Sequence, residues 1–167
     1  YPLVENTHHE GILRLTIAPA QNIPKSLQKK AEEYMHSLIN EMDHVGVMTL
    51  ELFDSSDELI VNEIAPRVHN SGHWTIEGAQ TSQFENHIRA ITNSPLGATS
   101  IKSSFNAMIN IIGMHGQTSK VLETKNAHLH LYDKEERKER KLGHITLTSN
   151  SMEELNKSID SLKEYLP

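Results

Sequence analysis

The sequence contains no cysteine, and only 5% of its 167 residues are aromatic. The absence of cysteine excludes disulfides and thiolate metal sites, and it suits a reducing cytoplasm. No apolar run approaches the roughly 18 residues of a membrane-spanning helix, and no signal-peptide pattern is visible, so we expect no membrane partner. Positive charge is also scarce, since the formal net charge is −6, which argues against a nucleic-acid partner.

The remaining composition is that of a folded domain. Hydrophobic residues make up 37% of the chain and charged residues 23%, which excludes extensive disorder and allows a sizeable core. Apolar and polar residues alternate over Gly11–Ala18, which predicts a strand. Helical spacing after Pro24 predicts an amphipathic helix. Ser151 followed by Glu154 has the form of a capping box, which predicts a closing helix that runs to about Leu166.

Both helices and strands are expected along the chain, and we expect an α+β fold. We predict a second helix over residues 80–91 and further strands over residues 106–113, 128–132 and 143–148. Turn-forming residues gather between positions 92 and 97 and mark a boundary. The sequence therefore predicts two domains, residues 1–95 and residues 96–167. The chain begins in strand-like sequence without Met, so we expect it to be a piece of a longer protein.

The most informative stretch begins with two β-type runs, Val45–Phe53 and Glu58–Ile64, which flank a polar turn at residues 54–57. Apolar runs on both sides of such a turn predict a hairpin. Each run carries one carboxylate, Glu51 or Glu63, where a core strand would prefer an apolar residue. These two glutamates are candidate ligands for a metal ion.

Whether the two glutamates share a face depends on the register of the hairpin. A strict four-residue turn would place Glu51 and Glu63 on opposite faces, because side chains alternate along a strand. An odd loop or a bulge would pair Glu51 with Val61 and bring Glu63 to the diagonal position, roughly 7 Å away. Two carboxylates on one face would suit Mg²⁺, or Mn²⁺ in its place. The alternative is that one glutamate is simply exposed on a half-wet sheet.

A loop rich in hydrogen-bonding side chains follows the hairpin, with Arg67, His69 and Asn70 at its centre. Arg67 offers a planar fork for carboxylate or phosphate oxygens, and Gly72 permits a tight backbone. An isolated loop of this kind is commonly surface decoration. Because it directly follows the paired glutamates, we interpret it as part of a candidate site.

Two other patterns have ordinary structural explanations. His128 and His130 would lie on one face of a strand, as zinc ligands can, but no third and fourth ligand recur at zinc-like spacing. The run from Lys134 to Lys141 interleaves basic residues with glutamates, which is typical of a solvated loop. The alternative for this run is that one or two of its cations reach a phosphate.

The stretch from Asn62 to Thr75, NEIAPRVHNSGHWT, resembles the signature of the 5-(carboxyamino)imidazole ribonucleotide synthases, ATP-grasp ligases of purine biosynthesis. The likeness covers nearly the whole chain and continues at residues 1–6, 11–13, 83–85, 89–92, 108–113, 128–132 and 140–144. It implies the rear portion of an ATP-grasp domain, an antiparallel sheet with flanking helices, followed by a small β-rich C-terminal domain.

The resemblance also implies a reaction. In this family ATP phosphorylates bicarbonate to carboxyphosphate, which then carboxylates the amine of aminoimidazole ribonucleotide, and the enzyme is a homodimer. The amino-terminal half of the family's proteins is absent from the sequence, so we expect the chain alone not to catalyse the reaction. Two alternatives remain: another ATP-grasp ligase or carboxylase, and a non-catalytic assembly domain.

Site roles follow from the resemblance position by position. Glu51 and Glu63 would hold Mg²⁺ against the phosphates of ATP. Asn62, together with Glu63, would line the nucleotide site, and His8 matches a position near the nucleotide.

The remaining implied roles concern the substrates. Arg67, His69 and Asn70 would form the catalytic group around bicarbonate and the aminoimidazole, where they would offset negative charge. Lys134 and Arg140 match positions that bind the 5′-phosphate of the ribonucleotide. The family commonly has Arg-Pro-Gly-Arg-Lys at residues 137–141, whereas this chain has Lys138-Glu139 in place of Pro-Gly. We therefore expect the phosphate loop to have a different shape.

Overall fold

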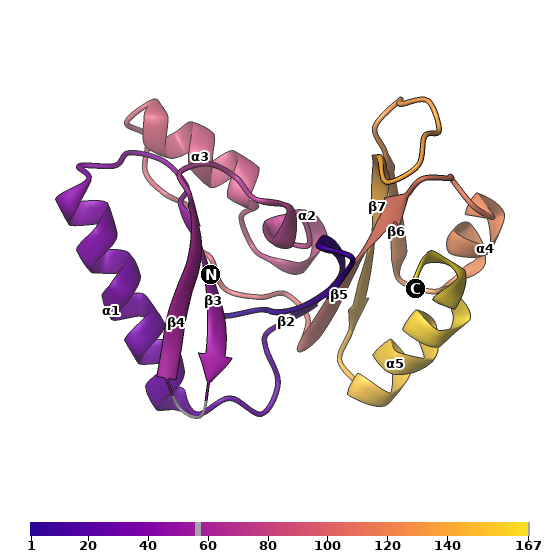
Figure 1. Cartoon of the computed structure of the whole chain (residues 1–167), viewed down its shortest axis with the longest axis horizontal. Helices are drawn as coiled ribbons and strands as arrows, with labels where there is room; N and C mark the ends of the chain where they lie inside the picture. The colour runs from indigo at the N-terminus through magenta and orange to yellow at the C-terminus, as the bar shows by residue number, and fades with distance from the viewer. Residues whose placement is uncertain (56–57, 167) are drawn as a thin grey trace.

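The computed structural model describes residues 1–55 and 58–166, which form a five-stranded sheet, a two-stranded hairpin and flanking helices (Figure 1). The elements in chain order are β1 (Glu5–His9), β2 (Ile12–Ala18), α1 (Lys25–Glu41), β3 (Thr49–Ser55), β4 (Glu58–Ala65), η1 (Asn70–Gly72), α2 (Thr75–Gly78), α3 (Gln83–Ile91), β5 (Phe105–Ile112), α4 (Thr118–Glu123), β6 (Ala127–Leu131), β7 (Lys141–Ser149), α5 (Met152–Ser161) and η2 (Lys163–Tyr165). Among the described helices, none has the length and apolar character needed to span a membrane.

The five-stranded sheet has the order β1-β2-β5-β7-β6, and all of its neighbouring strands are antiparallel. Ile109 lies opposite Leu15 on β2 and opposite Ile145 on β7. The predicted α+β fold with antiparallel sheets and flanking helices is confirmed. Because β2 pairs with β5, the sheet runs across the boundary predicted near residue 95, and the division into two domains stays a prediction.

The two faces of this sheet differ in polarity. One face packs against α5 and η2 through fully buried Ile109, Ile145, Leu155 and Leu162 (Figure 1). Each such side chain contributes about 1.5–3 kcal/mol by leaving water. The opposite face packs against Trp74. It also carries five buried polar residues: Thr16, Asn106, Asn110, His144 and Thr146. Most of the buried polar residues therefore lie on this side of the sheet, whereas Ser149 lies on the other.

The hairpin β3–β4 lies beside α1, where Leu59 packs against Leu27 and Ala31. Its first strand begins at Thr49, so the predicted start at Val45 was wrong. Gly46 has a φ of +127°, and the backbone N–H of Val47 donates to Nδ1 of His87 at 3.1 Å, so this segment is bonded to α3 instead of β4. Ser55 pairs with Glu58, and the remaining residues of the predicted turn, 56 and 57, lie outside the described residues.

Local capping decides where two helices begin. The helix predicted from residue 80 begins at Gln83, because the side chain of Ser82 accepts the N–H of Glu85 at 3.1 Å. The predicted cap at Ser151 is confirmed, since its hydroxyl accepts the N–H of Glu154 at 3.4 Å, whereas its own N–H donates to Oγ of Ser149 at 3.0 Å and not to Glu154. These caps satisfy N–H groups that would otherwise lack partners at the helix start.

Candidate functional site

A β-bulge on β4 brings the two candidate metal ligands together. Glu51 lies directly opposite Glu63, whereas the next residue, Leu52, lies opposite Val61, so Asn62 is the extra residue on β4. The bulge on which a shared face depended is therefore present. Glu63 is the direct neighbour of Glu51, not its diagonal neighbour, and directly opposite Cβ atoms are about 4.5–5.5 Å apart.

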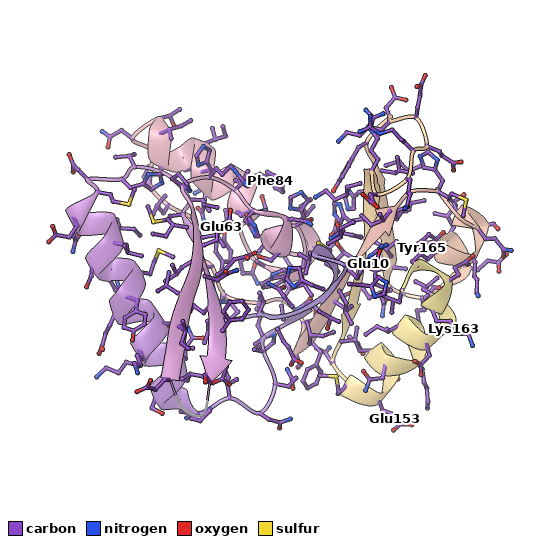
Figure 2. All side chains as sticks on the ribbon, in the orientation of Figure 1. Glu10, Glu63, Phe84, Glu153, Lys163 and Tyr165 are labelled. Atoms are coloured by element: carbon purple, nitrogen blue, oxygen red, sulfur yellow. The ribbon has the colours of Figure 1, made fainter. Side chains whose placement is uncertain are left out.

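Both glutamates act on His69. Oε1 of Glu51 lies 3.4 Å from Nε2 of His69, and Oε2 of the same carboxylate accepts from Nδ2 of Asn62 at 3.4 Å. Burial lowers the pKa of His69, while the charges of Glu51 and Glu63 oppose this shift. Glu63 is exposed on β4 (Figure 2), yet its charge reaches the same imidazole as that of Glu51. The two carboxylates therefore share one side of the hairpin.

This pair fits a hard divalent cation. Within residues 1–55 and 58–166, no group of three or more histidines, aspartates or glutamates is placed to hold a metal ion. Two carboxylates without further protein ligands suit Mg²⁺, which keeps several waters and takes phosphate oxygens as its other ligands. Glu51 and Glu63 thus have the donor chemistry for a magnesium ion shared with a nucleotide.

Gln83 fixes the loop that follows the hairpin. Its side chain is 2% exposed, Oε1 accepts the N–H of His69 at 3.0 Å, and Nε2 donates to the carbonyl of His69 at 2.7 Å. A Cβ on Gly72 would lie 2.5 Å from Oε1 of Gln83, so this close approach requires glycine. The sequence did not indicate this role, because the side chain comes from a helix 14 residues further along the chain.

The ring of His69 is fixed as well. Its Nδ1 accepts the N–H of Ser71 at 3.3 Å and lies 2.9 Å from the hydroxyl of the same residue. The remaining proton of the neutral ring is then on Nε2, which faces Glu51. The predicted catalytic histidine is therefore held in one tautomer.

Adjacent loop residues contact opposite sides of the site. His69 contacts Glu51 on the hairpin, and Oδ1 of Asn70 accepts from Nζ of Lys141 at 2.6 Å. Lys141 begins β7 of the five-stranded sheet. The loop therefore connects an acidic pair on one sheet with a cation on the other.

A second bulge directs Lys141 toward the loop. Ile111 pairs with Gly143 and Ile112 pairs with Lys141, which leaves Leu142 as the extra residue, buried in the core. Burial lowers the pKa of Lys141 to about 8, and repulsion from Lys134 and Arg67 adds to this shift. The sequence did not identify Lys141 as a site residue, because plain alternation would turn it away from this face.

The other predicted cations are placed differently. Arg67 is exposed, its Nη1 donates to the carbonyl of Val68 at 2.9 Å, and its charge lowers the pKa of both His69 and Lys141. Nη1 of Arg140 donates to the carbonyl of Glu135 at 3.5 Å, within its own loop. The structure thus brings Arg67 to the loop, whereas the described contacts of Arg140 remain outside the site.

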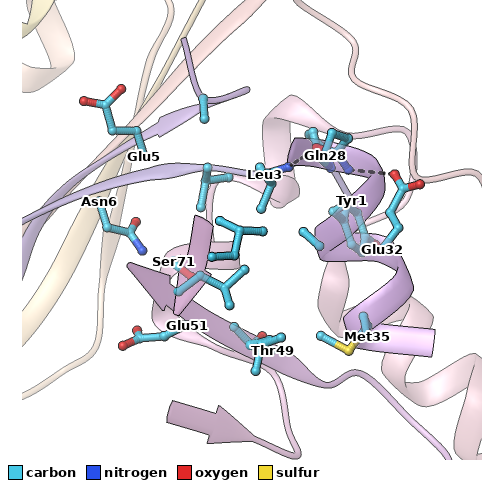
Figure 3. A pocket seen from close by; sticks show the side chains of 18 of the residues that line it. Tyr1, Leu3, Glu5, Asn6, Gln28, Glu32, Met35, Thr49, Glu51 and Ser71 are labelled. Carbon is cyan, nitrogen blue, oxygen red and sulfur yellow. Dashed lines mark hydrogen bonds between the residues drawn. The ribbon is translucent and has the colours of Figure 1, made fainter. Parts of the chain in front are cut away.

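A cavity of about 830 Å³ opens beside Glu51, between α1 and the strands β1 and β3, and Glu63 is not among the residues that line it (Figure 3). Its apolar wall comes from α1 and the start of the chain. Figure 3 shows Asn6, Ser71 and Glu51 together at the other side. The predicted nucleotide residues His8 and Asn62 also line this cavity. Its volume lies within the range of about 300–1,000 Å³ typical of small-molecule sites.

A buried aromatic and imidazole cluster lies behind Lys141. Nδ1 of His144 lies 2.6 Å from the hydroxyl of Tyr132, and its ring stacks on His130 with centroids 4.3 Å apart. Nε2 of His130 lies 2.8 Å from Oε1 of Glu77 on α2. Burial lowers the pKa of His144 to about 2 and raises that of Tyr132 to about 12, so both stay neutral. His130 therefore has a carboxylate partner, which explains it without zinc.

Comparison with protein families matches both parts of the chain. Residues 1–84 match the ATP-grasp domain, and residues 106–158 match the phosphoribosylaminoimidazole carboxylase C-terminal domain. The N5-carboxyaminoimidazole ribonucleotide synthase of Pseudomonas aeruginosa is 49% identical over 147 residues, which are 88% of this chain and 40% of that relative.

Solved structures of the same kind of enzyme are also similar to this chain. The N5-carboxyaminoimidazole ribonucleotide synthetase of Thermus thermophilus superposes with a TM-score of 0.96 at 51% identity, over 99% of this chain and 46% of that one. An Aspergillus clavatus N5-carboxyaminoimidazole synthase in complex with ADP and 5-aminoimidazole ribonucleotide superposes with a TM-score of 0.88 at 35% identity, over the same shares. The chain therefore spans less than half the length of these relatives.

Proposed function

Because the chain belongs to the ATP-grasp family, we propose that it supplies the metal-binding, loop and phosphate-binding parts of a carbon–nitrogen ligase. The reaction is carboxylation of 5-aminoimidazole ribonucleotide by bicarbonate at the expense of ATP, as the names of its relatives suggest. The activity belongs to the whole protein, since the chain spans less than half of its relatives. By family likeness, we infer that the whole protein is a homodimer.

This proposal rests on one observation: the loop contacts charged residues of both sheets. His69 and Asn70 are consecutive, and they contact Glu51 at 3.4 Å and Lys141 at 2.6 Å. An anion at this loop would have a divalent cation on one side and ammonium groups on the other. Transfer of a phosphoryl group to bicarbonate gathers negative charge, which this arrangement is suited to offset.

In the first step, an oxygen of bicarbonate attacks the γ-phosphorus of ATP, and ADP leaves. Mg²⁺ held by Glu51 and Glu63 would neutralise charge on the transferred phosphoryl group. The nucleotide would occupy the cavity lined by His8 and Asn62. Arg67 would offset the charge on bicarbonate, because a guanidinium binds two oxygens at once.

In the second step, the amine of the ribonucleotide attacks the carbonyl carbon of carboxyphosphate, phosphate leaves and the amine loses a proton. Asn70, bonded to Lys141, would orient the reacting carboxyl group. The ammonium groups of Lys134 and Lys141 would bind the 5′-phosphate of the ribonucleotide. Arg140, bonded to the carbonyl of Glu135, would support this site by holding the phosphate loop.

The test is ADP release by the full-length protein. We expect release that depends on both bicarbonate and 5-aminoimidazole ribonucleotide, with the 167-residue chain alone as an inactive control. Release that is indifferent to the ribonucleotide would contradict the proposal. Full turnover by the 167-residue chain would show that the residues present here suffice.

A further inference from the structure

Tyr132 lies where the buried cluster meets the cations of the site. Its backbone N–H donates to the carbonyl of Leu142 at 2.9 Å, which ties it to the bulge on β7. Its hydroxyl lies 2.6 Å from Nδ1 of His144. Because burial keeps both groups neutral near pH 7, this is a hydrogen bond between neutral partners.

The partner of this bond is itself immobilised. His144 is 1% exposed, stacks on His130 with centroids 4.3 Å apart, and meets the edge of His73 at 5.2 Å. His130 is held in turn by Glu77 at 2.8 Å. Rings packed on two sides have no room to rotate, because protein interiors are close-packed. The phenol of Tyr132 is therefore fixed in direction.

Two ammonium groups lie close to the ring of Tyr132. Nζ of Lys134 lies 5.5 Å from its centroid and Nζ of Lys141 lies 5.6 Å from it, both within the range of a cation–π interaction. Lysine side chains are flexible, so two of them converge on one point only when something restrains them. The charge of Lys134 lowers the pKa of Lys141, which shows that the two ammonium groups are close.

We propose that Tyr132 is a positioning residue for the phosphate of the ribonucleotide: its ring, fixed by His144, holds the ammonium groups of Lys134 and Lys141 where one phosphate binds both. This inference rests on the proposed function. Two restrained cations bind an anion more tightly than two mobile ones, because less side-chain entropy is lost on binding. Tyr132 itself does not touch the reacting atoms.

The test compares two substrates in the full-length protein, 5-aminoimidazole ribonucleotide and the riboside that lacks its phosphate. We expect Tyr132→Leu to raise KM for the ribonucleotide about tenfold, while kcat and the reaction of the riboside stay unchanged. Tyr132→Phe keeps the ring and should raise KM less. Tyr34→Leu is the matched control, because Lys30 lies 6.0 Å from the centroid of that ring, and neither residue is among those that line the cavity beside α1.

A purely structural role predicts another pattern. If Tyr132→Leu lowered the melting temperature but left the preference for the ribonucleotide over the riboside intact, the proposal would be wrong. A rise in KM for bicarbonate that is equal with both substrates would also overturn it, since the lysines would then serve the other anion.

A second measurement separates this proposal from the proposed function. Inorganic phosphate should raise the melting temperature of the wild type and of Tyr34→Leu, but much less that of Tyr132→Leu. That result would support the positioning role even in a protein that showed no ribonucleotide-dependent ADP release. An equal rise in all three proteins would refute the role.

Discussion

The two sides of the loop share one backbone feature but differ in how exposed their charged side chains are. On each side a β-bulge, at Asn62 on β4 and at Leu142 on β7, turns a charged side chain toward the loop. The hairpin has only two strands, and Glu63 is exposed to water. On the five-stranded sheet Lys141 is half-buried, and burial lowers its pKa to about 8.

This difference indicates how each side attracts its ligand. Glu63 is exposed and Glu51 is partly buried, with 17% of its side chain exposed, so a divalent ion between them would offset both charges directly. On the other side Lys134 is exposed and Lys141 is half-buried, so Lys141 acts in the lower dielectric, where it would attract an anion more strongly. We therefore expect the hairpin to be sensitive to loss of a ligand atom and the sheet to be sensitive to pH.

The largest effect is expected on the acidic side. Glu63→Gln removes one anionic ligand but keeps the size of the side chain, so ADP release should fall on the order of 10²-fold or more while folding is unchanged. Titration with Mg²⁺ should show a weaker apparent affinity. Glu58→Gln, an exposed change on the same strand, is the control. Equal activity in the Glu63→Gln and Glu58→Gln variants would contradict the hypothesis that Glu63 is a metal ligand.

The next effect concerns the loop between the two sides. Gln83→Leu leaves the N–H and carbonyl of His69 without the partners at 3.0 and 2.7 Å. Unpaired groups of this kind cost about 1–3 kcal/mol each, so urea unfolding should show a loss of that order. ADP release should fall more than tenfold, because the loop positions groups on both sides. Gln80→Leu, at an exposed position, should change neither quantity.

The basic side should respond to pH. Lys141 binds an anion only while protonated, and its pKa is about 8 in the folded chain, so KM for the ribonucleotide should rise as pH increases above about 8. Lys141→Arg stays charged throughout this range and should abolish the rise. A pH profile that is identical in wild type and variant would contradict this assignment. The titratable or charged groups that face Lys141 include Lys134, Arg67, Tyr132, His69, His73 and His144.

The buried imidazoles should limit stability in acid. Burial lowers the pKa of His73 to about 4 and that of His144 to about 2, against an ordinary value of 6.5. The unfolded chain therefore binds more protons below pH 6.5, and the free energy of unfolding should decrease as pH falls from about 6.5 toward 4. Urea unfolding of His144→Gln should show a shallower decrease. His128→Gln, at an exposed position, should follow the wild type. The cationic groups that act on His73 are Lys141, His69 and His130, and those that act on His144 are His130, His73 and Lys141.

The smallest effect is expected in the phosphate loop. Glu139 has a φ of +62°, a left-handed conformation, at the position where the family commonly has glycine. A residue with a Cβ pays roughly 1–2 kcal/mol for this conformation, partly offset by the greater unfolded-state entropy of glycine. Glu139→Gly should therefore raise the free energy of unfolding by up to about 1 kcal/mol. A loss of stability would show that the side chain makes a contact worth more than the strain.

The sequence predicted those parts of the site that depend on local pattern. Alternation located the hairpin, and the position of Glu51 and Glu63 within it showed that a bulge was needed for a shared face. The polar loop after the hairpin pointed to His69 and Asn70, and the resemblance gave them roles; the structure brings the two residues into contact with the two sides. Periodicity located most helices and strands of the α+β fold but not always their buried faces, since α3 buries Gln83 and Asn86 while Ile88 and Ile91 are exposed.

The remaining site residues depend on contacts between distant segments. Lys141 belongs to a run of mixed charge, and only the bulge at Leu142 turns it toward Asn70. Gln83 lies in the first turn of a helix, and its role is visible only where that helix meets the loop. In the sequence His144 is simply one polar residue in a strand. Only the pairing of β6 with β7 places the ring of His130 on that of His144. Periodicity carries no information about such pairings.

The adjacency of His69 and Asn70 has a thermodynamic consequence. Their Cα atoms are about 3.8 Å apart, across a single peptide unit that cannot twist freely. A ligand that shifts one of these residues therefore changes the free energy of occupying the neighbouring subsite. Such linkage is reciprocal, so under the proposed function any factor that the nucleotide applied to the affinity for the ribonucleotide would be returned by the ribonucleotide to the nucleotide.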